Sequence, residues 1–393
     1  MMTGRASRTT PAVPVDEMDR LLVLVVAAII SLGLLMVASA SITAADREMG
    51  QPFFYLTRQI IYLGLGLTVG LGCLLVPIQV WERSSPILLI VAYLLLAAVL
   101  IPGIGREVNG STRWLPLGPV NLQVSEPARL LILMFVSGYV ARRSHQLGTT
   151  AGGFFKPMGL VSIAFLLLLL EPDFGAATVL MATAMAVLFA GGVRIKYFLS
   201  LAVPAAAGLA ALVFLSPYRL RRLTAFLDPW ADPYDSGFQL TQSLIAIGRG
   251  ELGGVGLGGS VQKLFYLPEA HTDFVFAVFA EEFGLVGVIM LVALYAVLIW
   301  RIMTVSSRCA GSGALFSACL TFGLGAWLGA QAIVNIGVNM GLLPTKGLTL
   351  PLMSFGGSSL ITCCAAIGII LRADLERRRL ANRPAARPRR SRP

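Results

Sequence analysis

Charge is what this chain has least of. Only 13% of its 393 residues are Asp, Glu, Lys or Arg, about half of the roughly 25% that is usual in soluble domains. Hydrophobic residues make up 56% of the chain, and the mean hydropathy is +0.79. So few charges cannot cover the surface of a soluble domain of this size, so we interpret the chain as an integral membrane protein.

Histidine and cysteine are scarce as well, and this excludes two common kinds of site. The chain has two histidines and five cysteines. It has no H-E-x-x-H zinc motif, and no Ser-His-Asp set is apparent because His145 is expected on the cytoplasmic side. The cysteines lie in or beside apolar runs without metal-site spacing, so we interpret them as packing residues.

Long apolar runs are what the sequence has instead. A helix needs about 20 apolar residues to cross a bilayer, and ten runs approach that length. They are 20–41, 59–77, 85–101, 127–141, 158–171, 174–191, 197–216, 272–300, 312–340 and 357–371. The short pair 158–171 and 174–191 pivots on Glu171-Pro172-Asp173, which is either a tight external turn or a break within a re-entrant pair. We therefore expect an all-α integral membrane protein with about ten transmembrane helices.

The arginines and lysines near the ends of these runs predict the orientation. Basic residues favour the cytoplasmic side, which places the N-terminal tail 1–19 and the basic C-terminal tail 373–393 there. The first run is too long for a cleaved signal peptide, so we expect it to be retained. Between the tails lies one membrane domain, 20–372, whose outward loops are 102–125, 217–270 and 341–356. The loop 217–270, between helices 7 and 8, is the largest, and long loops cross largely regardless of their own charge.

The net charge of +11 does not indicate a nucleic-acid partner. Much of it lies in the Arg/Pro-rich segment 376–393, which is typical of a disordered tail that touches anionic lipid headgroups. No folded basic domain is present on which nucleic-acid binding could be built.

Glycines recur in two patterns. The loop 248–259 contains a formal G-x-G-x-x-G, but a dinucleotide site needs that motif inside a βαβ unit. We therefore expect its glycines to allow sharp turns or close approach of the backbone to a ligand. Gly66 and Gly70, and likewise Gly325 and Gly329, have the spacing that allows close helix packing.

Polar residues gather in the outward loops. Glu126 and Arg129 are three residues apart, so they share a face of the helix that begins near Pro127. They form either a simple ion pair or an anion site in which Arg129 faces a phosphate. Arg113 lies in the loop before this helix, and another cluster holds Lys346, Ser354 and Ser358. Non-helical backbone at membrane depth is tolerated where it lines a cavity or packs against protein, so this cluster suggests a cavity wall.

The most informative stretch is His271-Thr272-Asp273, which runs directly into an apolar span. A carboxylate at a membrane boundary is costly and therefore a functional hypothesis. A carboxylate at a helix N-terminus is also stabilised by the helix dipole, and position alone favours neither interpretation. The clusters together suit a lipid-linked substrate with its polar head at the outer surface. Cationic side chains could hold a pyrophosphate, and a carboxylate could activate an acceptor hydroxyl.

Short motifs along 20–372 resemble those of the SEDS family (shape, elongation, division and sporulation proteins). They are Arg113-Trp114, Gln123-Val124-Ser125-Glu126-Pro127, Glu171-Pro172-Asp173-Phe174-Gly175, Phe226-Leu227-Asp228-Pro229, Gly256-Leu257-Gly258, Leu267-Pro268-Glu269-Ala270-His271-Thr272-Asp273-Phe274, Gly341-Leu342-Leu343-Pro344 and Ser354-Phe355-Gly356-Gly357-Ser358. Gln262-Lys263 followed by Tyr266-Leu267-Pro268-Glu269-Ala270 resembles the cell-division branch, FtsW, more than the elongation branch, RodA.

The resemblance implies ten transmembrane helices and a glycosyltransferase that polymerises lipid II into glycan strands outside the cytoplasmic membrane. It also implies a complex with a class B penicillin-binding transpeptidase (FtsI-type) and other division proteins at the septum. Asp273 matches the family's key catalytic acid. The substrate-binding candidates are Glu126, Arg129, Arg113, His271, Lys346, Ser354 and Ser358. Many relatives carry Lys at the position of Arg129, which keeps a phosphate contact but changes its geometry. No cofactor is required by these residues; a divalent cation, Mg²⁺ or Mn²⁺, is compatible with them.

A rival interpretation is a transporter that moves lipid II across the membrane. A transporter places its binding residues near the bilayer midplane, on broken helices. Glu281 and Glu282, two turns into the span after Asp273, are the feature that best fits it. The outward position of the polar clusters favours the enzyme.

Overall fold

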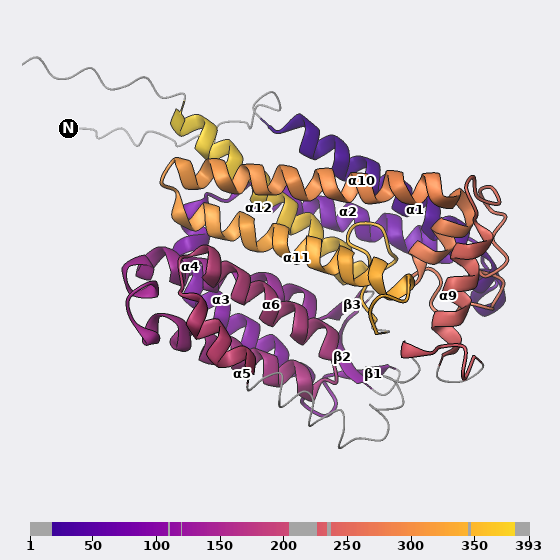
Figure 1. Ribbon diagram of the computed structural model, residues 1–393, viewed down its shortest axis with the longest axis horizontal. Helices are drawn as coiled ribbons and strands as arrows, with labels where there is room; N and C mark the ends of the chain where they lie inside the picture. Colours follow the sequence, from indigo (N-terminus) through magenta and orange to yellow (C-terminus); the bar gives the residue numbers. More distant parts are fainter. Residues whose placement is uncertain are drawn as a thin grey trace, which may run out of the picture.

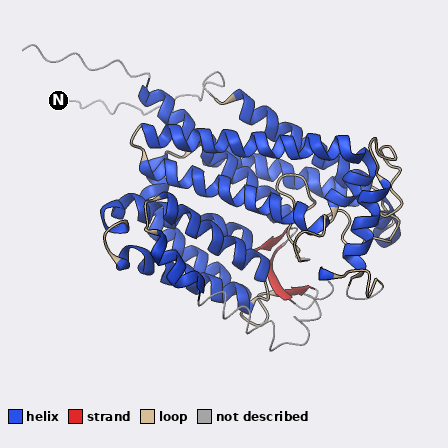
Figure 2. Cartoon of the chain, in the orientation of Figure 1, coloured by secondary structure: helices blue, strands red, loops and turns tan. Residues whose placement is uncertain are grey.

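The computed structural model describes residues 18–108, 111–118, 120–203, 226–233, 237–344 and 347–381. Long helices lying side by side make up most of it (Figures 1 and 2). They are α1 (Arg20–Met49), α2 (Phe54–Leu75), α3 (Ile78–Val99), α4 (Ser125–Leu147), α5 (Ala151–Leu170), α6 (Phe174–Ala190), α9 (Phe238–Arg249), α10 (Val275–Gly311), α11 (Leu315–Asn339) and α12 (Gly357–Ala381).

Nine of the ten expected spans coincide with helices in these described ranges. Of the tenth, 197–216, residues 197–203 are helical and the others lie outside the described residues. Among the described residues, seven helices are long and apolar enough to cross a membrane: α1, α2, α3, α5, α10, α11 and α12. The apolar α6 is shorter, with 17 residues, and α4 carries buried charges in its first turn. Between α5 and α6, Glu171-Pro172-Asp173 forms a tight turn.

Both ends of the described chain lie at the same end of the bundle (Figure 1). Asp19 caps α1, accepting a hydrogen bond from the Leu22 N–H at 3.1 Å. Its carboxylate also pairs with Arg301 of α10 and lies 3.8 Å from Arg378 of α12. The strands and α9 lie at the opposite end. This arrangement agrees with two tails on one side of a membrane; that this side is the cytoplasmic one remains a prediction.

Glycines allow α2 and α12 to pack backbone to backbone. A Cβ atom added at Gly70 would lie 2.8 Å from the Cys364 carbonyl oxygen, and one added at Gly368 would lie 2.1 Å from the Gly70 carbonyl oxygen. Gly66 also faces Cys364, whose Sγ atom would be 3.1 Å from the added Cβ. The expectation of close helix packing at Gly66 and Gly70 is therefore confirmed.

One element departs from the all-α expectation. The loop before α4 forms a three-stranded antiparallel sheet of β1 (Arg106–Val108), β2 (Ser111–Leu117) and β3 (Val120–Gln123), in the order β1-β2-β3. Trp114 pairs with Gln123 in the register of β2 and β3. Strands of three to seven residues are too short to appear among apolar runs of about 20 residues. The sheet leads directly into α4 and stands beside the loops of the same end (Figure 2).

Helix α10 is broken at Gly284, whose φ of 64° and ψ of −165° are not helical. The segment 250–256 supplies backbone partners at the break. The amides of Val255 and Gly256 donate to the carbonyls of Glu281 and Glu282 at 3.0 and 3.1 Å, and the Leu285 amide donates to the Glu251 carbonyl at 2.9 Å.

The glycines of 248–259 make this contact with α10 close. A Cβ added at Gly250 would lie 2.1 Å from the Ala280 carbonyl oxygen, and one added at Gly254 would lie 2.1 Å from that of Glu282. Close backbone approach was expected at these glycines. Its partner is the backbone of α10 rather than a ligand.

Candidate active site

The turn that carries Asp273 is held against α11 by two asparagines. Asn335 and Asn339 are one helical turn apart, and their amide groups donate to the Asp273 carbonyl oxygen at 2.8 and 3.1 Å. The Asn339 side-chain oxygen also accepts a hydrogen bond from the Ala277 amide at 3.2 Å, within the first turn of α10. The backbone of Asp273 is thereby fixed on α11, while its side chain stays partly exposed.

The carboxylate of Asp273 is left available. Across the described part of the chain, no side chain or amide donates a hydrogen bond to it. A Cβ atom added at Gly347 would lie 2.9 Å from Asp273 Oδ2, so glycine at this position leaves the carboxylate room. A carboxylate with free lone pairs at the edge of the protein can accept a proton from a bound hydroxyl.

The surroundings also raise the pKa of Asp273. Burial is the largest cause, and the negative charges of Glu269 and Asp173 add to it, while Arg113 acts in the opposite direction. Together they raise the pKa from 3.8 to about 7. A general base works best when its pKa lies near the working pH, and Asp273 meets that condition at neutral pH.

Arg113, on β2, reaches the turn between α5 and α6. Its Nε atom donates to the Glu171 carbonyl oxygen at 3.2 Å, and its Nη2 atom donates to that of Pro172 at 2.5 Å. Arg113 therefore joins the sheet to this turn and brings its positive charge near Asp273. Its contact with substrate remains a prediction.

The same turn holds an acid that sequence reasoning did not assign to the site. The Glu171 side chain is fully buried, and neither of its carboxylate oxygens has a hydrogen-bond partner among the described residues. Burial, reinforced by Asp173 and opposed by Arg113, raises the pKa of Glu171 to about 8. Glu171 is therefore mostly protonated at neutral pH. The signal that points to it is the motif Glu171-Pro172-Asp173-Phe174-Gly175, which carried part of the family resemblance.

Glu126 and Arg129 lie on one face of α4, as their spacing predicts. Arg129 Nη2 is 3.6 Å from Glu126 Oε1, and the residue is only 1% exposed. Its Nη1 atom donates to Gln331 at 3.1 Å, and the guanidinium lies 5.4 Å from the centre of the Trp327 ring. The Nε and Nη2 atoms make no hydrogen bond within the described residues. That these two buried donors bind an anion such as a phosphate remains a prediction.

The two serine candidates are buried and bonded to backbone. The Ser354 hydroxyl accepts from the Leu350 amide at 2.8 Å. The Ser358 hydroxyl accepts from the Gln123 amide at 2.7 Å and donates to the Asn121 carbonyl at 3.3 Å. Ser358 thus fastens β3 to the start of α12. Direct contact of either serine with substrate remains a prediction.

His271 packs into an aromatic cluster beside Asp273. Its ring centre lies 4.5 Å from that of Tyr55 and 5.5 Å from that of Phe355. Burial lowers the pKa of His271, although Glu269 and Glu48 oppose this, so the ring is neutral at pH 7. Its proposed contact with substrate stays a prediction. Lys346, the remaining candidate, lies outside the described residues.

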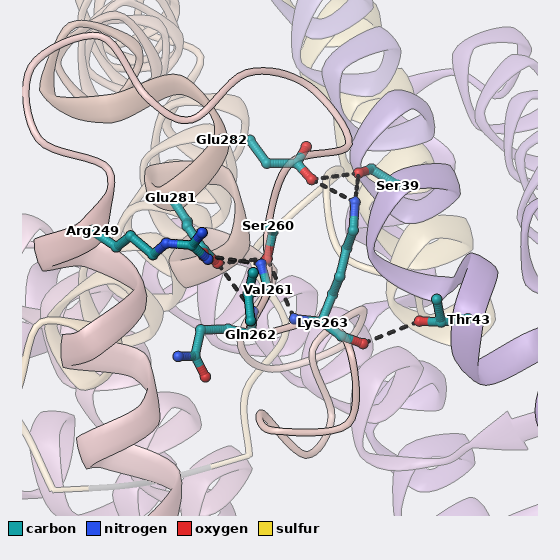
Figure 3. Close-up of polar contacts among 9 residues, drawn as sticks. All are labelled: Ser39, Thr43, Arg249, Ser260, Val261, Gln262, Lys263, Glu281 and Glu282. Atoms are coloured by element: carbon teal, nitrogen blue, oxygen red, sulfur yellow. Dashed lines mark hydrogen bonds and ion pairs between the residues drawn. The ribbon is translucent and has the colours of Figure 1, made fainter.

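The two acids that best fit a transporter are engaged with the segment 249–263 (Figure 3). Glu281 pairs with Arg249 at 2.9 Å, and Glu282 pairs with Lys263 at 2.8 Å. Both carboxylates are thus neutralised by basic residues from 237–270. They are bound to the protein's own side chains.

These features belong to a known family. The family model described as "Cell cycle protein", which covers FtsW, RodA and SpoVE, matches residues 19–379. The chain belongs to the FtsW/RodA/SpoVE family. A protein of Nitrosococcus halophilus named "Probable peptidoglycan glycosyltransferase FtsW" is 56% identical over 89% of this chain and 90% of its own length. A protein of Coxiella burnetii with the same name is 54% identical over 91% of this chain and 96% of its own length.

Solved structures in this family share the fold. One, described as coordinating polymerisation and crosslinking in a peptidoglycan synthase complex, has a TM-score of 0.77 at 32% identity. The match covers 92% of this chain and 98% of the chain in that structure. The rod shape determining protein RodA of Thermus thermophilus has a TM-score of 0.68 at 31% identity, covering 92% of this chain and 97% of its own. The identities near 55% to FtsW proteins place this member of the family in the cell-division branch.

The described residues of this chain do not form a complete binding site for a divalent cation. Among the residues that the structure describes, no group of three or more His, Cys, Asp or Glu side chains is arranged to hold a metal ion. We therefore derive no step through a metal. A cation held by one carboxylate together with substrate phosphates, as Mg²⁺ often is, remains a prediction.

Proposed function

We propose that this chain is a peptidoglycan glycosyltransferase of the cell-division branch, which polymerises lipid II at the outer face of the cytoplasmic membrane. The observation that carries the proposal is the state of Asp273. Its carboxylate is partly exposed, has no donor among the described residues and has a pKa raised to about 7. The names of the FtsW relatives support the same activity.

The reaction joins two lipid II molecules. A sugar hydroxyl of the acceptor attacks the anomeric carbon of the donor, and Asp273 takes the proton of that hydroxyl. The bond from the anomeric carbon to the lipid pyrophosphate breaks, and undecaprenyl pyrophosphate leaves. Glycoside hydrolysis with inversion needs a second carboxyl group as acid. A pyrophosphate leaves as a stable anion, so a cation can replace that acid, and Arg129 is the described residue that best fits this role.

The rival function, transport of lipid II, is separable by a one-sided assay. We expect purified protein in liposomes to form glycan polymer when lipid II is present in the leaflet that faces the 237–275 end of the bundle. No flippase should be needed, because the acids and bases of the site lie at that end. The assay measures polymer length on gels and the movement of labelled lipid II between leaflets. Movement between leaflets without any polymer would support the transporter instead.

We propose a single-span class B penicillin-binding transpeptidase of the FtsI type as the partner, within the assembly of division proteins at the septum. The similarity to a chain from a peptidoglycan synthase complex supports this proposal. Within the membrane, α11 is largely buried in the bundle, whereas α10 is mostly exposed. Of the two Gly- and Ala-rich spans at 272–300 and 312–340, α10 is therefore the better docking surface for another helix.

Full activity is expected to require this partner. Adding the purified transpeptidase at equal concentration should raise the polymerisation rate several-fold, and an inactive transpeptidase should do so equally well because only its binding matters. The measurement is the initial rate of lipid II consumption in detergent or liposomes. Equal rates with and without the partner would contradict the proposal.

A further inference from the structure

Lys263 is in contact with Glu282 of the broken helix α10 (Figure 3), and this contact closes a ring of chain from 263 to 282 that contains Asp273. Lys263 Nζ lies 2.8 Å from Glu282 Oε1, and the two residues are 19 apart in sequence. Asp273 stands near the middle of the ring, ten residues after Lys263 and nine before Glu282. A shift of either end of this ring therefore moves the turn that carries the proposed base.

The Lys263–Glu282 ion pair is buried in the protein. The Lys263 side chain is 5% exposed and that of Glu282 is 0% exposed. Ser39 of α1 completes the cluster, since its hydroxyl donates to Glu282 Oε1 at 2.6 Å and accepts from Lys263 Nζ at 2.9 Å. Thr43, one turn further along α1, donates to the Lys263 carbonyl oxygen at 3.1 Å. The ring is thereby fastened to α1 as well as to α10.

Glu281 makes a second set of contacts with the same loop, next to those of Glu282. It accepts hydrogen bonds from the Ser260 hydroxyl at 2.5 Å, the Val261 amide at 3.0 Å and Arg249 Nη1 at 2.9 Å. Four backbone hydrogen bonds between 251–256 and the break at Gly284 lie next to it. Neighbouring acids on one helix thus hold two successive parts of the same loop.

We propose that Glu282 and Glu281, through Lys263 and Ser260, are positioning residues that set the place of the Asp273 carboxylate for glycosyl transfer. This inference rests on the proposed function. Both acids are bound to residues of the loop and of α1, and neither takes a proton in the reaction. Their effect passes through the first segment of α10, 275–283, which is only about two turns long.

Two sides hold that short segment. Asn335 and Asn339 of α11 fix its start, and the loop residues Lys263 and Ser260 fix its end. The break at Gly284 separates it from the remaining 27 residues of α10, 285–311. A misplacement of about 1 Å at a catalytic group can cost about 10²-fold in rate. A buried ion pair adds little net stability compared with apolar side chains, and holding a geometry is one use that such pairs can have.

The test removes both charges of the pair together, so that no unpaired charge is left buried. We expect Lys263→Met with Glu282→Gln to insert and to melt within a few degrees of the parent protein. Its kcat for lipid II polymerisation should fall by about 10-fold or more, while KM stays within about twofold. The reversed pair, Lys263→Glu with Glu282→Lys, should recover most of kcat.

The pH profile gives a readout that a merely structural pair would not move. Opening the ring exposes Asp273 further to water, which lowers its pKa toward the ordinary value, so the acidic limb of kcat should shift to lower pH. The other charges acting on Asp273 are Glu269 of its own turn, Arg113 of β2 and Asp173 at the start of α6. All three are unchanged in the double variant.

The matched control is an ion pair at the other end of the same helix. Asp19 and Arg301 also form a largely buried pair on α10, so Asp19→Asn with Arg301→Met removes a comparable contact far from Asp273. This control should leave kcat and the pH profile per folded protein unchanged. Should the Lys263/Glu282 double variant not fold, Ser260→Ala removes the hydrogen bond to Glu281 and the one from the Lys263 amide without touching a charge. It should show a smaller fall in kcat and the same direction of pH shift.

The outcomes separate this inference from the proposed function. If the parent protein forms no polymer, the proposed function fails. If the parent polymerises but the folded double variant keeps the parent kcat and pH profile, the positioning role is overturned. A rise in KM at unchanged kcat would also overturn it, because the pair would then act in binding. If the double variant does not fold, the positioning role is overturned when Ser260→Ala keeps the parent kcat and pH profile.

Discussion

Replacing Asp273 by asparagine is expected to lower lipid II polymerisation by at least about 10²-fold, the lower range of what general-base catalysis contributes. Asparagine keeps the size of the side chain but cannot accept the proton of the acceptor hydroxyl. The two hydrogen bonds from Asn335 and Asn339 go to the backbone carbonyl of Asp273, so they survive the change. The variant should therefore fold and insert normally. Polymer formed by purified protein, scaled to the folded fraction, measures the effect.

The matched control is Glu269→Gln in the same loop. Glu269 accepts a hydrogen bond from the Thr272 hydroxyl at 2.6 Å, and its charge raises the pKa of Asp273. Its neutral variant should keep the rate within a few-fold and move the acidic limb of the pH profile to lower pH. An Asp273→Asn protein that polymerises within a few-fold of the parent would remove Asp273 as the base, and Glu126 would become the next candidate.

The raised pKa of Asp273 also sets the expected pH dependence. The base must be ionised, so the rate should rise with pH through about 7 and then level off. Stability changes in the opposite direction. The folded pKa lies above the ordinary 3.8, so folding favours the protonated acid, and stability falls as pH rises from about 4 through 7. Asp273→Asn should therefore be at least as stable as the parent at pH 8, as measured by thermal melting in detergent.

Much of the membrane architecture was predictable because it depends on composition over about 20 residues. Nine apolar ranges coincide with described helices, since a bilayer demands a length and an apolarity that the sequence displays directly. The spacing of Glu126 and Arg129 predicted their shared face for a similar reason, as helix periodicity is local. The close helix packing at Gly66 and Gly70 was predictable for the same reason, because their spacing on one helix face is also local.

The parts that could not be predicted depend on contacts between distant residues. Strands β1 to β3 are too short to be recognised by hydropathy, and Ser358, 235 residues further along the chain, holds one of them. Glu281 and Glu282 looked like charges inside a membrane span, because their partners lie far away in sequence. Arg249 ends α9, and Lys263 lies in the segment that follows it and folds back onto the break at Gly284. Nothing local in 281–282 reveals that pairing.

Removing the charge of Arg129 should be the second large effect, on stability and on rate together. In Arg129→Met the buried Glu126 carboxylate loses its cationic partner, and breaking a buried pair in this way typically costs about 3–5 kcal/mol. Loss of a cation that stabilises a leaving pyrophosphate should also lower polymerisation by about 10²-fold, in the range found for single oxyanion-stabilising groups. Arg129→Lys keeps the charge and a point contact to phosphate, so it should retain most of the rate.

A double variant distinguishes these two roles of Arg129. Glu126→Gln with Arg129→Met removes both charges, so most of the lost stability should return, because no buried charge is left unpaired. The rate should stay low, because the guanidinium donors that make no hydrogen bond among the described residues, Nε and Nη2, are still absent. Melting temperature and polymerisation measured on the same preparations give the answer. If the double variant regains the parent rate along with its stability, Arg129 serves only to neutralise Glu126, and the phosphate contact must come from another cation of this end of the bundle.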